Sequence, residues 1–143
     1  MQYSDMRVLL VEDHAFQRRL GLRLLEDLGI GNVMEAAEGF EALEMLRAMQ
    51  TPPDVVLVDL DMPGMDGVEF IGLIAQHRLA PAIAVVSAMD AALLHSVQVM
   101  AQASGLRVLG SVEKPLSSAK LTHVLSLLDS EAGASSIDPA VQV

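Results

Sequence analysis

The sequence contains no cysteine and no tryptophan, and aromatic residues make up only 3% of its 143 residues. Without cysteine the chain has neither disulfides nor thiolate metal ligands, which fits a reducing compartment. The core must therefore be built from aliphatic residues and the nine methionines. Hydrophobic residues make up 52% of the chain, which is enough at this length to form one compact domain.

Positive charge is also scarce in this chain. Nine Lys and Arg residues oppose nineteen Asp and Glu residues, so the formal net charge is −10. This charge repels nucleic-acid backbones and anionic membrane surfaces, and neither is expected as a direct partner. The first residues lack the basic start and long apolar core of a signal peptide, and no apolar run is long enough to span a bilayer. We therefore expect a cytoplasmic protein.

Short runs rich in Val, Ile and Leu alternate with longer segments whose apolar residues recur at three- and four-residue steps. The runs are Arg7–Val11, Val33–Ala36, Val55–Val58, Ala82–Val86 and Leu106–Leu109. This alternation predicts an α/β fold with five parallel strands in one doubly wound sheet and five helices on its two faces. We expect this domain to occupy residues 1–129. The segment 130–143 has no period and is typical of a disordered tail or the start of a linker.

Charged and hydroxyl-bearing residues follow four of the five predicted strands. They are Glu12 and Asp13 after the first run, Asp59 and Asp61 after the third, Ser87 after the fourth, and Glu113 and Lys114 after the fifth. Taken singly, such residues are as often turn residues or helix caps. In an open α/β sheet, however, ligands bind beyond the carboxyl ends of the strands, near the point where strand order reverses. We therefore expect these side chains to meet at one edge of the sheet.

Carboxylates that meet at one edge repel one another, and a positive charge must offset the repulsion. Two like charges about 4 Å apart cost about 4 kcal/mol at an effective dielectric near 20. The candidates for the offset are a bound cation and the ammonium of Lys114. Oxygen ligands without Cys or His at the strand ends favour Mg²⁺ over Zn²⁺. Carboxylates around such a metal, with a Lys and a hydroxyl opposite, are what phosphoryl transfer to a carboxylate requires.

Four segments resemble the receiver domains of bacterial two-component response regulators. They are Val-Glu-Asp at 11–13, Val-Asp-Leu-Asp-Met-Pro-Gly-Met-Asp-Gly at 58–67, Ser87 after Ala-Val-Val, and Glu-Lys-Pro at 113–115. The resemblance spans residues 5 to 129 and implies a flavodoxin-like (βα)5 fold with strand order 2-1-3-4-5. It implies that Asp59 is the phosphoacceptor, that Ser87 is a switch hydroxyl, and that Lys114 is the ion-pair partner of the phosphoryl group.

The same resemblance implies a metal site for Mg²⁺ or Mn²⁺. Asp13 and Asp59 would bind the ion directly, Glu12 would hold it through water, and the backbone carbonyl of Asp61 would supply a further ligand. Such a domain is not an enzyme for other substrates, because it catalyses only its own phosphorylation and dephosphorylation.

The resemblance also implies details of the backbone and the partners. The Lys114-Pro115 bond is cis in the family, and Gly64 and Gly67 fit a loop that must turn sharply before the third helix. The phosphoryl group would come from a histidine kinase or a histidine phosphotransfer protein. The chain would then regulate an output domain or an effector protein.

Two features depart from the family pattern. Three positions before the Lys, where the family usually carries Tyr or Phe, this chain has Ser111. The stretch from Ser87 to Lys114 is also longer than in a minimal receiver, which predicts an extended fourth helix or following loop. Within this stretch, segments 93–101 and 105–116 are similar to receivers fused to cyclic-di-GMP phosphodiesterase (EAL) domains.

Two other functions are compatible with the sequence. Phosphatases of the haloacid-dehalogenase type also use an Asp-x-Asp after an apolar strand, with a later hydroxyl and Lys, which Asp59, Asp61, Ser87 and Lys114 imitate. That family places its further acidic pair after the Lys, whereas here the pair lies upstream. The other alternative is a receiver-like module that binds partners without using phosphate, and Ser111 keeps that possibility open.

Overall fold

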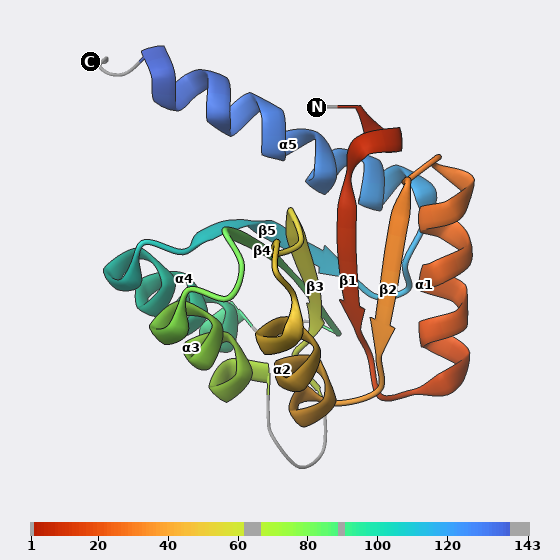
Figure 1. Ribbon diagram of the computed structural model, residues 1–143, viewed down its shortest axis with the longest axis horizontal. Coiled ribbons are helices and arrows are strands. Elements are labelled where there is room, and N and C mark those ends of the chain that lie inside the picture. Colours follow the sequence, from red (N-terminus) through yellow and green to blue (C-terminus); the bar gives the residue numbers. More distant parts are fainter. Residues whose placement is uncertain (1, 62–66, 89–90, 138–143) are drawn as a thin grey trace.

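The computed structural model describes residues 2–61, 67–88 and 91–137. Its strands are β1 (Arg7–Val11), β2 (Asn32–Ala36), β3 (Val55–Asp59), β4 (Ala82–Ser87) and β5 (Arg107–Glu113). Its helices are a short 3-10 helix η1 (Tyr3–Asp5), then α1 (Ala15–Asp27), α2 (Gly39–Ala48), α3 (Gly67–His77), α4 (Ala91–Ser104) and α5 (Ser118–Ile137). The strands form one parallel sheet in the order 2-1-3-4-5 (Figure 1), which confirms the predicted fold.

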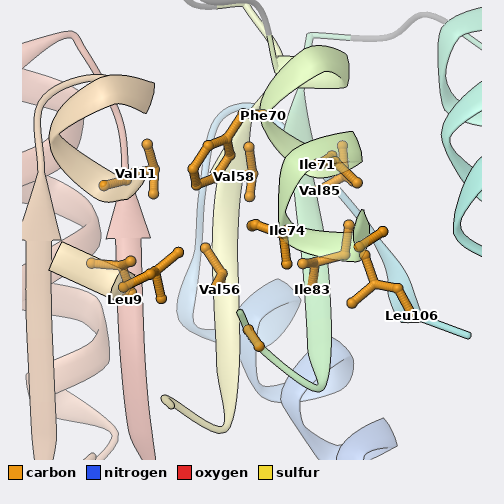
Figure 2. Close-up of a cluster of buried hydrophobic side chains, with 14 of the residues drawn as sticks. Leu9, Val11, Val56, Val58, Phe70, Ile71, Ile74, Ile83, Val85 and Leu106 are labelled. Carbon is orange, nitrogen blue, oxygen red and sulfur yellow. The ribbon is translucent and has the colours of Figure 1, made fainter. Parts of the chain in front are cut away.

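Different helices cover the two faces of the sheet. Figure 1 shows α1 and α5 on one face and α2, α3 and α4 on the other. Because successive side chains of a strand point to opposite faces, Leu9 packs with the residues of α2, α3 and α4, whereas its neighbour Val8 packs with those of α1 and α5. Figure 2 shows the first of these clusters, in which α3 contributes Phe70, Ile71 and Ile74.

The central strands are buried far more completely than the edge strands. Every residue of β3 and β4 is buried, because helices cover both faces of a parallel sheet. The edge strands β2 and β5 are each exposed in part. Asp59 and Ser87 are therefore the final residues of two fully buried strands, and the surrounding core fixes their backbone.

The fifth strand differs most from its predicted bounds. The sequence predicts a strand that ends at Leu109, whereas β5 continues to Glu113. Ile83 of β4 pairs with Val108, and Val85 pairs with Ser111, so that an extra residue of β5 is inserted between these pairs. Such an insertion is a β-bulge, and it disrupts the regular alternation that a strand shows in a sequence.

The bulge contains Gly110, whose φ is +152°. A residue with a Cβ rarely adopts this backbone angle, so glycine suits the position. The bulge takes up part of the extra length between Ser87 and Lys114, and α4 has 14 residues.

The last helix continues further than the apolar period indicates. α5 ends at Ile137, so helical backbone extends into the segment 130–143 that the sequence predicts to be a tail or linker. Leu128 of α5 is buried in the core. The division into a domain and a tail after residue 129 stays a prediction. Within the described ranges, we find no helix with both the length and the apolar character needed to cross a bilayer.

Candidate functional site

Three acidic residues converge where β1 and β3 end. Asp59 is the last residue of β3, and Glu12 and Asp13 follow β1, its neighbour in the sheet. Their carboxylate oxygens lie within 4.8 Å of one another. Glu12 and Asp59 are only 3% and 2% exposed, and Asp13 is half-buried. The sequence predicted this convergence, which occurs at the reversal of strand order between β1 and β3.

Lys114 supplies a positive charge within the acidic cluster. Its Nζ lies 3.1 Å from each carboxylate oxygen of Asp59 and 3.9 Å from Oδ2 of Asp61. Its backbone N–H donates to the carbonyl of Ser87 at 2.9 Å, which ties the residues after β5 to the end of β4. The bond from Lys114 to Pro115 is cis, as the resemblance implies. Lys114 is thus one of the two positive charges that the sequence suggested for this edge.

Ser87 and Asp61 lie at the same edge. Ser87 is buried at the end of β4, and the residue before it, Val86, pairs with Asp59. The backbone N–H of Asp61 donates to Oδ1 of Asp59 at 2.9 Å, and the Asp61 side chain is exposed. The roles expected for the Ser87 hydroxyl and the Asp61 carbonyl stay predictions.

The loop after Asp61 carries much of the sequence motif. Its residues Met62, Pro63, Gly64 and Asp66 lie outside the described residues. Gly67 begins α3, where an added Cβ would lie 2.6 Å from the Cα of Leu60 and 3.1 Å from the carbonyl oxygen of Asp59. Glycine is therefore required at position 67 for the close approach of α3 to the end of β3.

The acidic cluster changes the proton affinity of Glu12. Burial raises the pKa of the Glu12 carboxyl to about 7, and both the hydrogen bond with Asp59 and the charge of Asp59 add to this effect. The backbone N–H of His14, which donates to Oε2 of Glu12 at 3.2 Å, and the charge of Lys114 act in the opposite direction. Glu12 therefore takes up or releases a proton near neutral pH.

Lys114 stays charged in spite of its partial burial. Burial lowers the pKa of its ammonium, but the hydrogen bond to Asp59 and the charges of Asp59, Glu12 and Asp61 outweigh burial. The net result is a raised pKa. The ammonium is therefore a permanent counter-charge to the acids at working pH.

Two basic side chains support the loops of the site in ways that the sequence did not predict. On α1, Arg18 donates from Nη1 to the carbonyl of Glu12 at 2.9 Å and from Nε to Oε1 of Glu35 at 3.0 Å. Arg18 therefore fixes the backbone of Glu12 at the acid pair. No pattern of residue types or spacing in the sequence predicts its hydrogen bond to a backbone carbonyl.

The second supporting residue is Lys120, in the first turn of α5. Its Nζ donates to the carbonyl oxygens of Glu113 and Pro115, at 3.0 and 2.9 Å. These carbonyls lie on either side of Lys114, so Lys120 holds the backbone that presents the Lys114 ammonium. Ser117 caps the start of α5, since its hydroxyl accepts a hydrogen bond from the backbone N–H of Lys120 at 3.2 Å.

Comparison with known proteins identifies the family. Residues 8–126 match the family described as "Response regulator receiver domain". The chain belongs to this receiver family. The receiver is 32% identical over 123 residues to the cyclic di-GMP phosphodiesterase RocR of Pseudomonas aeruginosa, which covers 86% of this chain and 31% of RocR. It is 33% identical over 122 residues to the chemotaxis protein CheY-3 of Vibrio cholerae, which covers 85% of this chain and 90% of CheY-3.

Solved structures agree with this assignment of the receiver. The crystal structure of a response regulator from Colwellia psychrerythraea has a TM-score of 0.70 at 30% identity, and the match covers 87% of this chain and 98% of that one. Receiver domains are signalling modules and not, in general, enzymes. The similarity to RocR agrees with the resemblance to EAL-fused receivers, although the receiver spans only 31% of RocR.

Proposed function

We propose that this receiver accepts a phosphoryl group on Asp59 in a metal-dependent reaction and thereby regulates a partner. The observation that carries the proposal is the meeting of three carboxylates from two strands, with the ammonium of Lys114 in contact with Asp59. Asp59 is only 2% exposed, and the charged groups next to its carboxylate are Glu12, Asp13 and Lys114.

The residues at this edge fit a hard divalent cation. The cluster offers carboxylate oxygens from Glu12, Asp13 and Asp59, which are the ligands that Mg²⁺ and Mn²⁺ prefer. In the proposal, Asp13 and Asp59 bind the ion directly, Glu12 binds it through water, and the backbone carbonyl of Asp61 completes the protein ligands. The bound ion supplies positive charge next to the transferred group.

The protein side chains perform the remaining chemistry. An oxygen of the Asp59 carboxylate forms the new bond to phosphorus, while the bond from phosphorus to the histidine nitrogen of the donor breaks and that nitrogen keeps the electron pair. The ammonium of Lys114 stabilises the negative charge of the phosphoryl oxygens, and the hydroxyl of Ser87 donates a hydrogen bond to one of them. Loss of the group by hydrolysis resets Asp59, so the receiver catalyses only its own phosphorylation and dephosphorylation.

The proposal includes a donor and an output in the cytoplasm. The donor is a histidine kinase or a histidine phosphotransfer protein, and the output is a fused domain or an effector protein. RocR is named a cyclic di-GMP phosphodiesterase. If this chain is part of a longer protein, we therefore propose a cyclic di-GMP phosphodiesterase domain as its output. The net charge of −10 supports the absence of direct nucleic-acid or membrane binding.

The test is phosphoryl labelling with acetyl phosphate or a phosphorylated kinase in the presence of Mg²⁺. We expect the parent to take up label and Asp59→Asn to fall to background. Asp27→Asn is the matched control, because it makes the same change at an exposed residue at the end of α1, and it should retain uptake. Full labelling of Asp59→Asn would show that another residue is the acceptor.

The two alternative functions predict different results in phosphoryl labelling, Mg²⁺ binding and phosphomonoester turnover. A phosphate-independent receiver-like module, which Ser111 keeps open, would take up no label and would show no affinity for Mg²⁺. A haloacid-dehalogenase-type phosphatase would turn over a phosphomonoester continuously. The location of Glu12 and Asp13 directly beside Asp59 supports the receiver over the phosphatase.

A further inference from the structure

Arg107, the first residue of β5, joins this strand to α5. Its Nη2 donates to the carbonyl oxygens of Leu127 and Leu128, at 3.2 and 2.9 Å. Hydrogen bonds from a guanidinium to carbonyl oxygens are charge-assisted and stronger than neutral ones. Each carbonyl oxygen has two lone pairs, so it accepts this bond in addition to the bond within the helix. The contact therefore connects β5 to the middle of a continuous helix.

This contact lies at the last turn of α5 whose side chains the structure describes. The residues that anchor α5 recur at three- and four-residue steps and are Leu121, Val124, Leu125 and Leu128. Beyond Leu128 the helix continues to Ile137 through a stretch rich in Ser, Ala and Gly, and Figure 1 shows its C-terminal end projecting past the sheet. A short stretch of such composition is a marginal helix by itself. Among the side chains that the structure describes, the last anchored turn is that of Leu127 and Leu128, which Arg107 holds, and the direction of this stretch depends on it.

The same strand reaches the acidic site at its other end. β5 ends at Glu113, and the next residue is Lys114, which contacts Asp59. Between the two ends, the bulge lies against α5, because a Cβ added at Gly110 would be 3.6 Å from the side chain of Val124. A contiguous set of contacts thus runs from Asp59 through β5 to α5, and the experiment below measures whether it carries coupling.

We propose that Arg107 is a positioning residue that fixes the direction in which α5 leaves the domain and couples that direction to the state of Asp59. The coupling rests on the proposed function, whereas the fixing of α5 does not. When the contact between Lys114 and Asp59 changes, β5 shifts and the guanidinium of Arg107 moves the last anchored turn of α5. This route takes the place of the aromatic switch residue, because position 111 carries Ser and not Tyr or Phe. Phosphorylation would then change the orientation of the segment that follows α5.

The experiment measures the direction of α5 by pulsed electron paramagnetic resonance. Because the chain has no cysteine, two nitroxide labels can be attached specifically to the double variant Gln76→Cys and Ser136→Cys, on α3 and α5. In the unphosphorylated parent we expect one narrow distance distribution. In Arg107→Gln we expect the distribution to broaden and the main peak to be lost. The matched control is Arg47→Gln on the exposed side of α2, which should keep the narrow distribution.

A second arm tests the coupling with acetyl phosphate and Mg²⁺. We expect phosphorylation to shift the main peak of the parent and to leave the distribution of Arg107→Gln unchanged, although Asp59 of this variant takes up label like the parent. A phosphorylated parent with an unshifted peak would overturn the coupling. If the parent takes up no label, the proposed function fails, and the comparison of the unphosphorylated proteins still decides the role of Arg107.

The outcome that overturns the fixing of α5 is a distribution in Arg107→Gln as narrow as in the parent. Circular dichroism checks that this variant is folded. If it is not, Arg107→Lys takes its place, because Lys keeps the charge but lacks the planar guanidinium that reaches both carbonyls. We expect a broadened distribution in Arg107→Lys, and a parent-like width there would equally overturn the proposal.

Discussion

The central strands and the edge strand β5 contribute to the same site in different ways. β1, β3 and β4 pair with one another without irregularity and are buried almost throughout. Glu12 and Asp13 follow β1, and Asp59 and Ser87 end β3 and β4. β5 contains a bulge, is partly exposed and is followed by the cation, Lys114. The acids are thus fixed by the core, whereas their counter-charge follows a strand whose pairing is interrupted. The positions of the acids and of their counter-charge therefore depend on different parts of the sheet.

The largest effect that we expect at the central strands is a pH dependence of stability that arises from Glu12. Its pKa of about 7 in the folded, metal-free protein exceeds the ordinary value of 4.5 in the unfolded chain. The folded state therefore binds more protons between these values, and the stabilisation present below pH 4.5 is lost as pH rises through 7. The loss amounts to up to about 3 kcal/mol in the free energy of unfolding.

Urea unfolding of the metal-free protein on either side of this pH range measures the effect. Glu12→Gln has no carboxyl to titrate, so its free energy of unfolding should decline less than that of the parent over the same range. Equal declines in both proteins would show that Glu12 does not titrate near neutral pH.

A matched pair of substitutions compares the packing of the centre with that of the edge. Val56 of β3 is 0% exposed and lies in the cluster of Figure 2, whereas Val108 of β5 is only partly buried. Val56→Ala removes two buried carbon atoms and leaves a cavity, and should lower the free energy of unfolding by about 2.5 kcal/mol. Val108→Ala should cost under about 1 kcal/mol, since its neighbours and solvent fill the space. If denaturant unfolding gives the same loss of free energy for both variants, the centre and the edge of the sheet do not differ in packing.

The bulge of β5 can be tested by a smaller change. Gly110→Ala should lower the free energy of unfolding by about 1 kcal/mol, because its φ of +152° is unfavourable for a residue with a Cβ. Crowding does not contribute, since the nearest atom to the added Cβ is 3.6 Å away. Gly72→Ala in α3 is the control and should cost less, because Ala favours a helix and the atom nearest to the added Cβ, Sδ of Met100 at 3.3 Å, belongs to a flexible side chain. A parent-like midpoint for Gly110→Ala would argue against the bulge.

Sequence reasoning predicted the parts of the molecule that follow a regular pattern. The order of elements follows from alternating periods, and the acidic cluster follows from polar residues at the ends of buried runs. Glu12, Asp13, Asp59 and Lys114 were all predicted to meet, because parallel strands bring their carboxyl ends to one edge.

The features that were missed have physical reasons. The length of β5 was underestimated because the bulge interrupts the two-residue period between Val108 and Ser111. The bond of Arg18 to Glu12, the bonds of Lys120 and the bonds of Arg107 to α5 end on backbone carbonyls, which every residue type possesses. No pattern of residue types reveals which carbonyl a long basic side chain reaches.

The most direct test of the account is a crystal structure of the receiver with Mg²⁺ and beryllium fluoride, which mimics a phosphoryl group. The account predicts one ion bound by Asp13 and Asp59, with the fluoride group on a carboxylate oxygen of Asp59 and in contact with Lys114 and Ser87. A fluoride group on another residue, or an ion bound away from Asp13 and Asp59, would contradict it.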